Sequence, residues 1–344
     1  MKKALITGVA GQDGSYLSEF LLKKGYKVYG ILRRSSLEFK SRIDHLYKGG
    51  KKSQNFHPIY GDITDAISVN KIIKEVEPDE VYNLAAQSHV RVSFDIPGYT
   101  AQTDAIGTLN ILESIKQNNL IQKTKFYQAS TSELFGKAQE IPQNENTPFY
   151  PRSPYAAAKL YAHTITINYR EAYNMFASNG ILFNHESPRR GNAFITKKVV
   201  QSAVLIYKEK LDVLKVGNLY SKRDWGYAPD YVQAMWKILQ INKPDDFVIA
   251  TGETHTIKDL IELAFNYLNI EILWRGEGLD EIGINKKTKK TIVSIDPYYF
   301  RPTEVDLLIG DSSKAKSVLD WEAKTKFKDL IKIMINSELN NDWE

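Results

Sequence analysis

Four residues in two short segments have the types and spacing needed for proton transfer. Tyr155 and Lys159 stand four residues apart in a segment of helical character, so both side chains leave the same face of a helix. A free tyrosine has a pKa of about 10, and it acts as a base at neutral pH only when a positive charge, such as a lysine ammonium, stabilises the phenolate. Upstream, Thr131 can hydrogen-bond a reacting oxygen. Glu133 can take a proton from carbon next to a ketone and later protonate a leaving hydroxyl.

Each of these residues also has a plainer interpretation. The chain contains 20 tyrosines, so a Tyr–x–x–x–Lys pair can arise by chance, and Glu133 could be an ordinary surface or helix-start glutamate. The surrounding pattern favours the catalytic interpretation, because the Tyr155–Lys159 pair follows the fifth predicted strand of a dinucleotide-binding fold.

The elements that must position these residues begin with a glycine turn. An apolar run at 3–8 ends in the turn Gly8–Gly14, a helix is predicted over 14–24, and a second strand covers 27–32. Glycines let the backbone approach a pyrophosphate, and the N-terminus of the helix offers free N–H groups and a positive dipole. The spacing GxxGxxG, in place of GxGxxG, is typical of the short-chain dehydrogenase/reductase superfamily.

The same alternation of strands and helices continues along the chain. Further strands are predicted at 59–60, 80–84, 125–130, 180–184, 212–217 and 246–250, and helices at 66–76, 100–118, 155–173, 192–208, 229–240, 256–268 and 326–338. This pattern predicts an α/β protein with a Rossmann-type, doubly wound parallel sheet and a smaller, interleaved α/β substrate domain. We expect residues 1–184, with part of 212–250, to form the cofactor domain and 185–344 mainly the substrate domain. A Lys-rich polar stretch lies at 284–290.

The end of the second strand indicates which nicotinamide cofactor binds. An acidic residue there holds the ribose of NAD, whereas arginine accommodates a 2′-phosphate. Here the strand is followed by Arg33, Arg34, Ser35 and Ser36, which favours NADP; the alternative is two solvated arginines on a loop. We expect Asp62 to meet the adenine edge, and the turn 84–88 to pass beneath the cofactor.

Composition excludes several other classes. The 344 residues carry a net charge of +5, which is too small to indicate nucleic-acid binding. The absence of cysteine excludes disulfides, thiolate catalysis and cysteine-bound zinc, and suits a reducing compartment. The opening segment starts like a signal peptide, but its apolar stretch ends by Gly11–Asp13. No apolar run approaches about 20 residues. We therefore expect a cytoplasmic protein without a membrane span or a metal site.

Six motifs together resemble the GDP-mannose 4,6-dehydratase family of the extended short-chain dehydrogenases, and the similarity covers nearly the whole chain. They are Thr7–Tyr16, Phe126–Leu134, Thr147–Tyr155, Gly180–Gly191, Arg223–Gly226 and Arg301–Asp306. The resemblance implies bound NADP and a redox-neutral reaction that converts GDP-mannose to GDP-4-keto-6-deoxymannose. Tyr155 would take the 4-hydroxyl proton as hydride leaves C4. Glu133 would take the C5 proton, water would leave from C6, and hydride would return there, with Thr131 and Lys159 in support.

The resemblance also implies binding residues and an oligomer. Cofactor contacts are implied for Gly8, Val9, Ala10, Gly11, Gln12, Asp13, Arg33, Arg34, Ser35, Ser36, Asp62, Ile63, Leu84, Ala85, Ala86, Gln87, Ser88, Tyr99, Lys159, His185 and Arg190. Nucleotide-sugar contacts are implied for Ser88, Glu133, Asn184, Lys198, Arg223, Arg301 and Glu304. A homotetramer is implied as well. Apolar Phe39, Ile43 and Leu46 suggest a neighbouring subunit packed on the loop 37–52; the alternative is an amphipathic helix on its own core.

Three alternatives stay open at this point. The segments 162–164, 192–194 and 227–229 depart from the family pattern, and they leave a GDP-manno-heptose 4,6-dehydratase as a second candidate. A nucleotide-sugar epimerase or reductase of the same fold would not need Glu133. A catalytically silent NADP-binding regulator would not need the four residues Thr131, Glu133, Tyr155 and Lys159 together.

Overall fold

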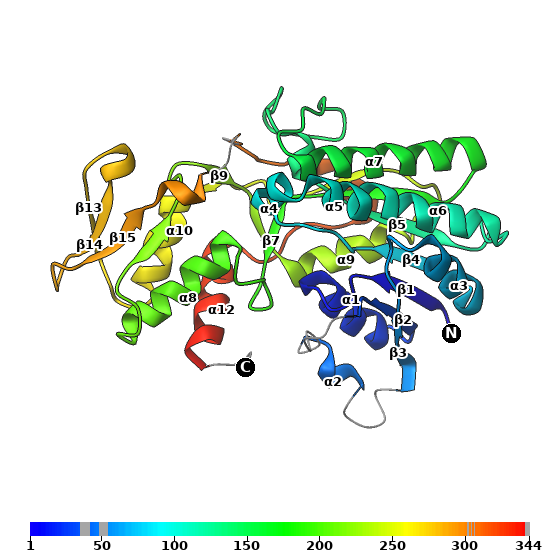
Figure 1. The fold of residues 1–344 in the computed structure, drawn as a ribbon, viewed down its shortest axis with the longest axis horizontal. Coiled ribbons are helices and arrows are strands. Elements are labelled where there is room, and N and C mark those ends of the chain that lie inside the picture. Colours follow the sequence, from blue (N-terminus) through cyan, green and yellow to red (C-terminus); the bar gives the residue numbers. More distant parts are fainter. Residues whose placement is uncertain (35–41, 48–53, 301–302, 304, 306, 341–344) are drawn as a thin grey trace.

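The computed structural model describes residues 1–34, 42–47, 54–300, 303, 305 and 307–340. Its centre is a seven-stranded parallel sheet with the order β11-β6-β5-β4-β1-β2-β3 (Figure 1). The strands are β1 (Lys3–Thr7), β2 (Lys27–Leu32), β3 (Phe56–Tyr60), β4 (Glu80–Asn83), β5 (Lys125–Thr131), β6 (Ala177–Leu182) and β11 (Phe247–Ile249). The chain order reverses between β1 and β4, and in such sheets ligands bind at this point, beyond the carboxyl ends of the strands. The predicted doubly wound sheet is confirmed.

Helices cover both faces of this sheet, which explains why burial does not alternate along its inner strands. Every residue of β4 and β6 is buried. One core joins the sheet to α1 (Gln12–Lys23) and α9 (Ala228–Ile238), and a second joins it to α3 (Ala66–Val76), α6 (Gly107–Gln117) and α7 (Pro154–Tyr173).

A separate core organises the later part of the chain. A four-stranded sheet has the order β13 (Ile272–Arg275), β14 (Ile282–Asn285), β15 (Thr291–Ile295) and β8 (Leu214–Val216). It packs with α8 (Ile195–Tyr207), α10 (Ile257–Asn266) and α12 (Phe327–Asn340) at one end of the molecule (Figure 1). Two short pairs, β7 (Asn184–Glu186) with β10 (Trp225–Tyr227) and β9 (Lys222–Arg223) with β12 (His255–Thr256), connect the halves. The chain returns through α9, β11 and α11 (Ser313–Leu319) to the first sheet.

Three local predictions need correction. The helix predicted over 100–118 is α5 (Pro97–Ala101), a π-helical turn over Gln102–Ile106 and α6. The polar stretch 284–290 is the end of β14 and the turn to β15. Strands β13 to β15 were not predicted because each has only four or five residues, and buried ones such as Ile284 and Val293 stand among partly exposed residues. The short helix α4 (Val90–Asp95) was also missed.

The proposed intersubunit role of two apolar residues is wrong. Ile43 precedes α2 (Asp44–Tyr47) and Leu46 lies within it, and both are buried in a core of their own chain that also contains Phe56. They are therefore not available to a neighbouring subunit. Phe39 lies outside the described residues.

Candidate active site

A single large cleft of about 1140 Å³ runs across the carboxyl ends of β1, β4 and β5 and continues to the second sheet. Of the predicted cofactor residues that the structure describes, all line it except Val9, Ala10 and Arg34. Val9 and Ala10 are not among its lining, and the Val9 side chain is fully buried against Gly30. Arg34 is exposed outside the cleft, and Ser35 and Ser36 lie outside the described residues.

The glycine turn brings three backbone segments unusually close together. Gly8 has a φ of +68°, and a Cβ there would lie 2.9 Å from the backbone of Ala85. A Cβ at Gly14 would lie 2.4 Å from the carbonyl oxygen of Gly8. Thr7 ties the turn to β4, because its hydroxyl accepts hydrogen bonds from the N–H groups of Leu84 and Ala85, both at 3.0 Å. The result is a side-chain-free cradle at the N-terminus of α1, which fits a pyrophosphate.

A partly buried ion pair lies beside this cradle. Asp13 Oδ2 lies 2.7 Å from His185 Nε2, while Nδ1 of the histidine lies 2.8 Å from the carbonyl oxygen of Phe183. Burial by itself would raise the pKa of Asp13, but the charge of His185 and its hydrogen bond lower it below the usual value. Burial would lower the pKa of His185, but Asp13 raises it. The two groups thus favour each other's charged forms across the junction of α1 and β7.

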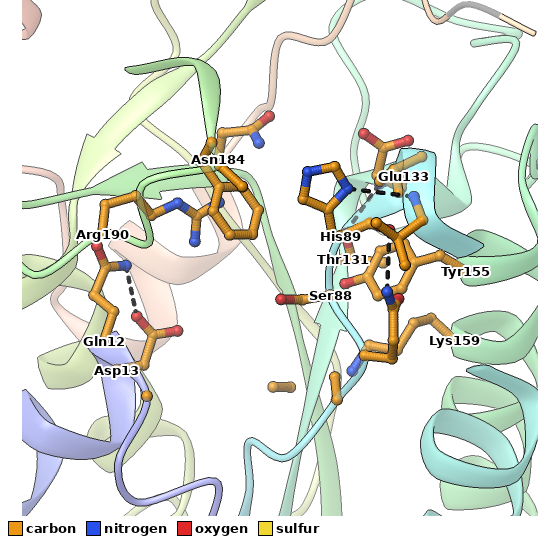
Figure 2. A pocket seen from close by; sticks show the side chains of 18 of the residues that line it. Gln12, Asp13, Ser88, His89, Thr131, Glu133, Tyr155, Lys159, Asn184 and Arg190 are labelled. Carbon is orange, nitrogen blue, oxygen red and sulfur yellow. Dashed lines mark hydrogen bonds between the residues drawn. The ribbon is translucent and has the colours of Figure 1, made fainter. Parts of the chain in front are cut away.

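The four residues predicted to be catalytic meet in the same cleft (Figure 2). Thr131 ends β5, and its hydroxyl accepts a hydrogen bond from the N–H of Glu133 at 3.2 Å. Ser153 caps α7 by accepting from the N–H of Ala156 at 3.0 Å, so the Tyr155–Lys159 pair starts at a fixed point of that helix. All four of these residues are buried, although they line the cleft.

Tyr155 is held as a neutral phenol in this arrangement. Burial raises the pKa of Tyr155 above its usual value, and the negative charge of Asp104 raises it further. A hydrogen bond with Thr131 and the positive charge of Arg190 act in the opposite direction, and they do not outweigh burial. Tyr155 therefore needs an additional positive charge beside it to act as a base.

The far end of the cleft carries polar groups suited to an anionic ligand. Asn184 Oδ1 is buried, and within the described chain no group donates a hydrogen bond to it. Lys198 places its ammonium 3.2 Å from the ring centroid of Tyr299, and Arg223 donates to the carbonyl oxygen of Val305 at 2.7 Å. The predicted substrate residues Arg301 and Glu304 lie outside the described residues.

The sequence interpretation missed His89, although it lines the cleft. Its Nδ1 accepts a hydrogen bond from the N–H of Val92 at 3.3 Å and caps α4. In the neutral form the proton must then sit on Nε2, so the ring offers a donor. His89 packs against Phe194, whose ring lies 3.7 Å from the Arg190 guanidinium. The position of His89 directly after the predicted turn 84–88 was the available signal.

Asp104 was also missed, and it is 1% exposed. Burial raises the pKa of its carboxyl to about 6. The charge of Lys159 and a hydrogen bond from the N–H of Gln87 lower this pKa, but they do not cancel the effect of burial. Nothing in the sequence distinguished it from an ordinary polar residue of the helix predicted over 100–118, because the π-helical turn that buries it was not predictable.

The sequence profile of the family described as GDP-mannose 4,6 dehydratase matches residues 5–334. The chain belongs to this family. A GDP-mannose 4,6 dehydratase of Drosophila melanogaster is 56% identical over 344 residues, which cover 98% of this chain and 86% of that protein.

Solved structures share the fold of this family member at lower identity. A UDP-glucose 4-epimerase of Thermotoga maritima, solved with UDP-glucose, has a TM-score of 0.81 and 24% identity, over 99% of this chain and 100% of that one. A dTDP-glucose 4,6-dehydratase of Bacillus anthracis, in complex with NAD, has a TM-score of 0.80 and 21% identity, over 100% of this chain and 98% of that one. Because an epimerase and a dehydratase match equally well, the fold alone does not choose the reaction.

No helix in the described ranges has both the length and the apolar character to span a bilayer. Within the same ranges, no group of three or more histidine and acidic side chains could hold a metal ion.

Proposed function

We propose that the chain converts GDP-mannose to GDP-4-keto-6-deoxymannose, with NADP as the cofactor. As a member of the GDP-mannose 4,6-dehydratase family it is a hydro-lyase. The observation that carries the assignment is the meeting of Thr131, Glu133, Tyr155 and Lys159 in one cleft with the glycine cradle. An epimerase or reductase would have no use for a buried carboxylate two residues after the catalytic hydroxyl.

The nicotinamide, when bound, supplies the redox chemistry by accepting one hydride from C4 of the sugar and returning it to C6. Tyr155 accepts the proton of the 4-hydroxyl, and Thr131 hydrogen-bonds the same oxygen. Glu133 takes the C5 proton, which the 4-keto group makes acidic, and its carboxylic acid protonates the hydroxyl that departs from C6 as water. The protons balance. The C5 proton leaves with the C6 hydroxyl as water, and C5 regains one proton in place of the 4-hydroxyl proton that Tyr155 accepted.

Different residues would bind the phosphate groups and the adenine of the cofactor. The cradle of Gly8, Gly11 and Gly14 suits the pyrophosphate, and Asp62 lines the cleft after β3. Arg33 also lines the cleft, and its guanidinium donates to the hydroxyl of Tyr99. A cation at this position, with no acidic residue at the end of β2, favours the 2′-phosphate of NADP over the free hydroxyl of NAD.

The nucleotide sugar would bind between Asn184, Lys198 and Arg223, a proposal supported by their position in the lining of the same cleft. Two cations and a free amide acceptor suit a diphosphate and a hydroxylated sugar. We assign residues 1–184, together with α9 and β11, to the cofactor domain. The rest of residues 185–344 mainly forms the domain that binds the nucleotide sugar. GDP-manno-heptose is the second candidate substrate, because the family-divergent Asn192, Ala193 and Phe194 line the cleft.

One assay tests the function. The protein is incubated with GDP-mannose or GDP-manno-heptose and NADP in deuterated water, and the products are analysed by mass spectrometry. Loss of one water, one solvent deuteron at C5 and no net consumption of reduced cofactor are expected. A product of unchanged mass with one inverted centre would indicate an epimerase, and stronger turnover of the heptose would reassign the substrate.

We further propose a cytoplasmic homotetramer. The absence of cysteine suits a reducing compartment, and the family resemblance supports the tetramer. Light scattering of the cofactor-bound protein tests the assembly, and a monodisperse particle of 39.3 kDa would contradict it.

A further inference from the structure

A buried carboxylate stands directly after one of the proposed substrate residues. Asp224 lies between Arg223, which ends β9, and Trp225, which starts β10, and it is 0% exposed. Arg223 lines the cleft. Asp224 is not among the lining residues, and its carboxylate contacts the loop after β11 and the segment before α11. The two neighbouring side chains therefore serve different sides of the same stretch of chain.

Four hydrogen-bond donors converge on the Asp224 carboxylate. Oδ1 accepts from the N–H of Thr251 at 2.9 Å and from the hydroxyl of the same residue at 2.6 Å. Oδ2 accepts from the N–H of Gly252 at 3.0 Å and from the N–H of Gly310 at 3.3 Å. An ionised carboxylate accepts at both oxygens and offers no donor. Burial raises the pKa of Asp224 to about 6, and these hydrogen bonds lower it without cancelling burial, so the carboxyl is ionised at neutral pH.

The segment that ends at Gly310 also holds the guanidinium of Arg223. This guanidinium donates to the carbonyl oxygen of Val305 at 2.7 Å. The N–H of Leu308 donates to the carbonyl oxygen of Lys222 at 3.3 Å. Val305 and Leu308 are buried together in one apolar core. The two stretches of chain therefore bind each other through the arginine, through the backbone and through the carboxylate that follows the arginine.

We propose that Asp224 is a positioning residue of the nucleotide-sugar site, which anchors the segment ending at Gly310 and thereby holds the Arg223 guanidinium in place for the diphosphate. The proposal rests on the proposed function, in which Arg223 binds this diphosphate. An arginine side chain loses much rotamer freedom when it binds an anion, and a fixed carbonyl acceptor removes part of that cost before the ligand arrives. Asp224 itself does not touch the ligand.

Asp224→Asn removes one of the two accepting oxygens. The amide nitrogen cannot accept, so the backbone N–H groups on its side lose their partner whichever way the amide is turned. The probe is GDP, whose Kd is measured by calorimetry on the NADP-bound protein above neutral pH. We expect GDP to bind about tenfold more weakly, as for the loss of one hydrogen bond to a charged group. The KM for GDP-mannose should rise by a similar factor, while kcat and the Kd for NADP stay at their wild-type values.

Asp230→Asn provides the matched control. Asp230 is 7% exposed, and its Oδ2 accepts from the N–H groups of Lys324 at 3.2 Å and Thr325 at 2.9 Å. It is thus a second buried carboxylate that holds a separate segment, and none of these three residues lines the cleft. We expect Asp230→Asn to leave the affinity for GDP unchanged. In an Arg223→Met background, Asp224→Asn should have little further effect, because the residue through which it acts is gone.

Hydrogen exchange of the wild-type protein tests the proposal even if Asp224→Asn fails to fold. Binding of GDP and anchoring of the segment must favour each other reciprocally. GDP should therefore slow exchange in the peptides that contain Thr251, Gly252 and Gly310, and leave exchange unchanged in those that contain Lys324 and Thr325.

Any of four results would overturn the proposal: unchanged GDP affinity in Asp224→Asn, an equal loss of affinity in Asp230→Asn, an equal loss in the Arg223→Met background, or no slower exchange at Thr251, Gly252 and Gly310 with GDP. Binding of GDP does not depend on the chemistry at the sugar. A wild-type protein that binds GDP but does not dehydrate GDP-mannose would contradict the proposed function alone. A wild-type protein that does not bind GDP would contradict both proposals.

Discussion

Gly14→Ala tests whether the close approach of α1 to the glycine turn forms the cofactor cradle. Gly14 lies in the first turn of α1, where its backbone conformation is compatible with alanine. On helix propensity alone the substitution should stabilise the helix by about 1 kcal/mol. The structure predicts the opposite, because the added Cβ would lie 2.4 Å from the Gly8 carbonyl oxygen and 2.6 Å from the Val9 Cα.

The size of the effect follows from these distances. Non-bonded carbon contacts are normally about 3.5 Å, so α1 or the Gly8–Val9 backbone must move by about 1 Å. Neither contact is the end of a flexible side chain, so the movement cannot be absorbed locally. Overpacking of this kind costs about 1–3 kcal/mol. The same displacement widens the pyrophosphate cradle, and each 1.4 kcal/mol lost from binding raises Kd about tenfold.

The assay combines cofactor titration by fluorescence with thermal unfolding. Gly98→Ala is the matched control: Gly98 lies in helix α5, and a Cβ there meets nothing within 4 Å. We expect Gly98→Ala to melt at or above the wild-type temperature with unchanged Kd for NADP. Gly14→Ala should melt lower and bind NADP about tenfold more weakly or worse. Wild-type Kd and stability in Gly14→Ala would refute the assignment of this turn as the cradle.

Three further predictions concern chemistry, cofactor choice and pH. Glu133→Gln should leave NADP binding intact and slow the elimination by about 10²–10⁴-fold, since an amide cannot accept the C5 proton; dehydration at a near wild-type rate would show that another group is the base. Arg33→Asp should weaken NADP binding and favour NAD relative to wild type, and equal affinity of the wild-type protein for both cofactors would contradict the role of Arg33. For the Asp13–His185 pair, the lowered pKa of Asp13 contributes stability above its usual value of 3.8, which is lost as pH falls through the lowered pKa. The raised pKa of His185 contributes stability below its usual value of 6.5, which is lost as pH rises through the raised pKa. Denaturant unfolding of the cofactor-free protein should therefore find this contribution greatest between the two usual values, and His185→Gln should remove that pH dependence; an identical profile in the variant would refute it.

Local sequence patterns were sufficient for the first half of the fold. The runs that became β1, β2, β4 and β5 were recognisable because both faces of such parallel strands are covered, so their apolar residues need not alternate with polar ones. The glycine turn and the Tyr155–Lys159 pair were recognisable for a related reason: close backbone approach and helical spacing are properties of a few consecutive residues. Strands β13 to β15 lacked such a signal, because they lie in a small sheet with one face partly open to solvent.

The sequence by itself determined the strand order of the first sheet, the glycine turn and the four residues predicted to be catalytic, since each depends on residues close together in the chain. Only the tertiary structure decided which distant residues complete the site. His185 hydrogen-bonds with Asp13, which lies 172 positions earlier in the chain, because β7 lies beside α1 in the fold. Asp104 is buried because it lies in a π-helical turn that packs against α7, and the pattern of residue types gives no sign of that turn. The same holds for Ile43 and Leu46, whose burial in their own chain depends on packing against Phe56 and not on their local apolar character.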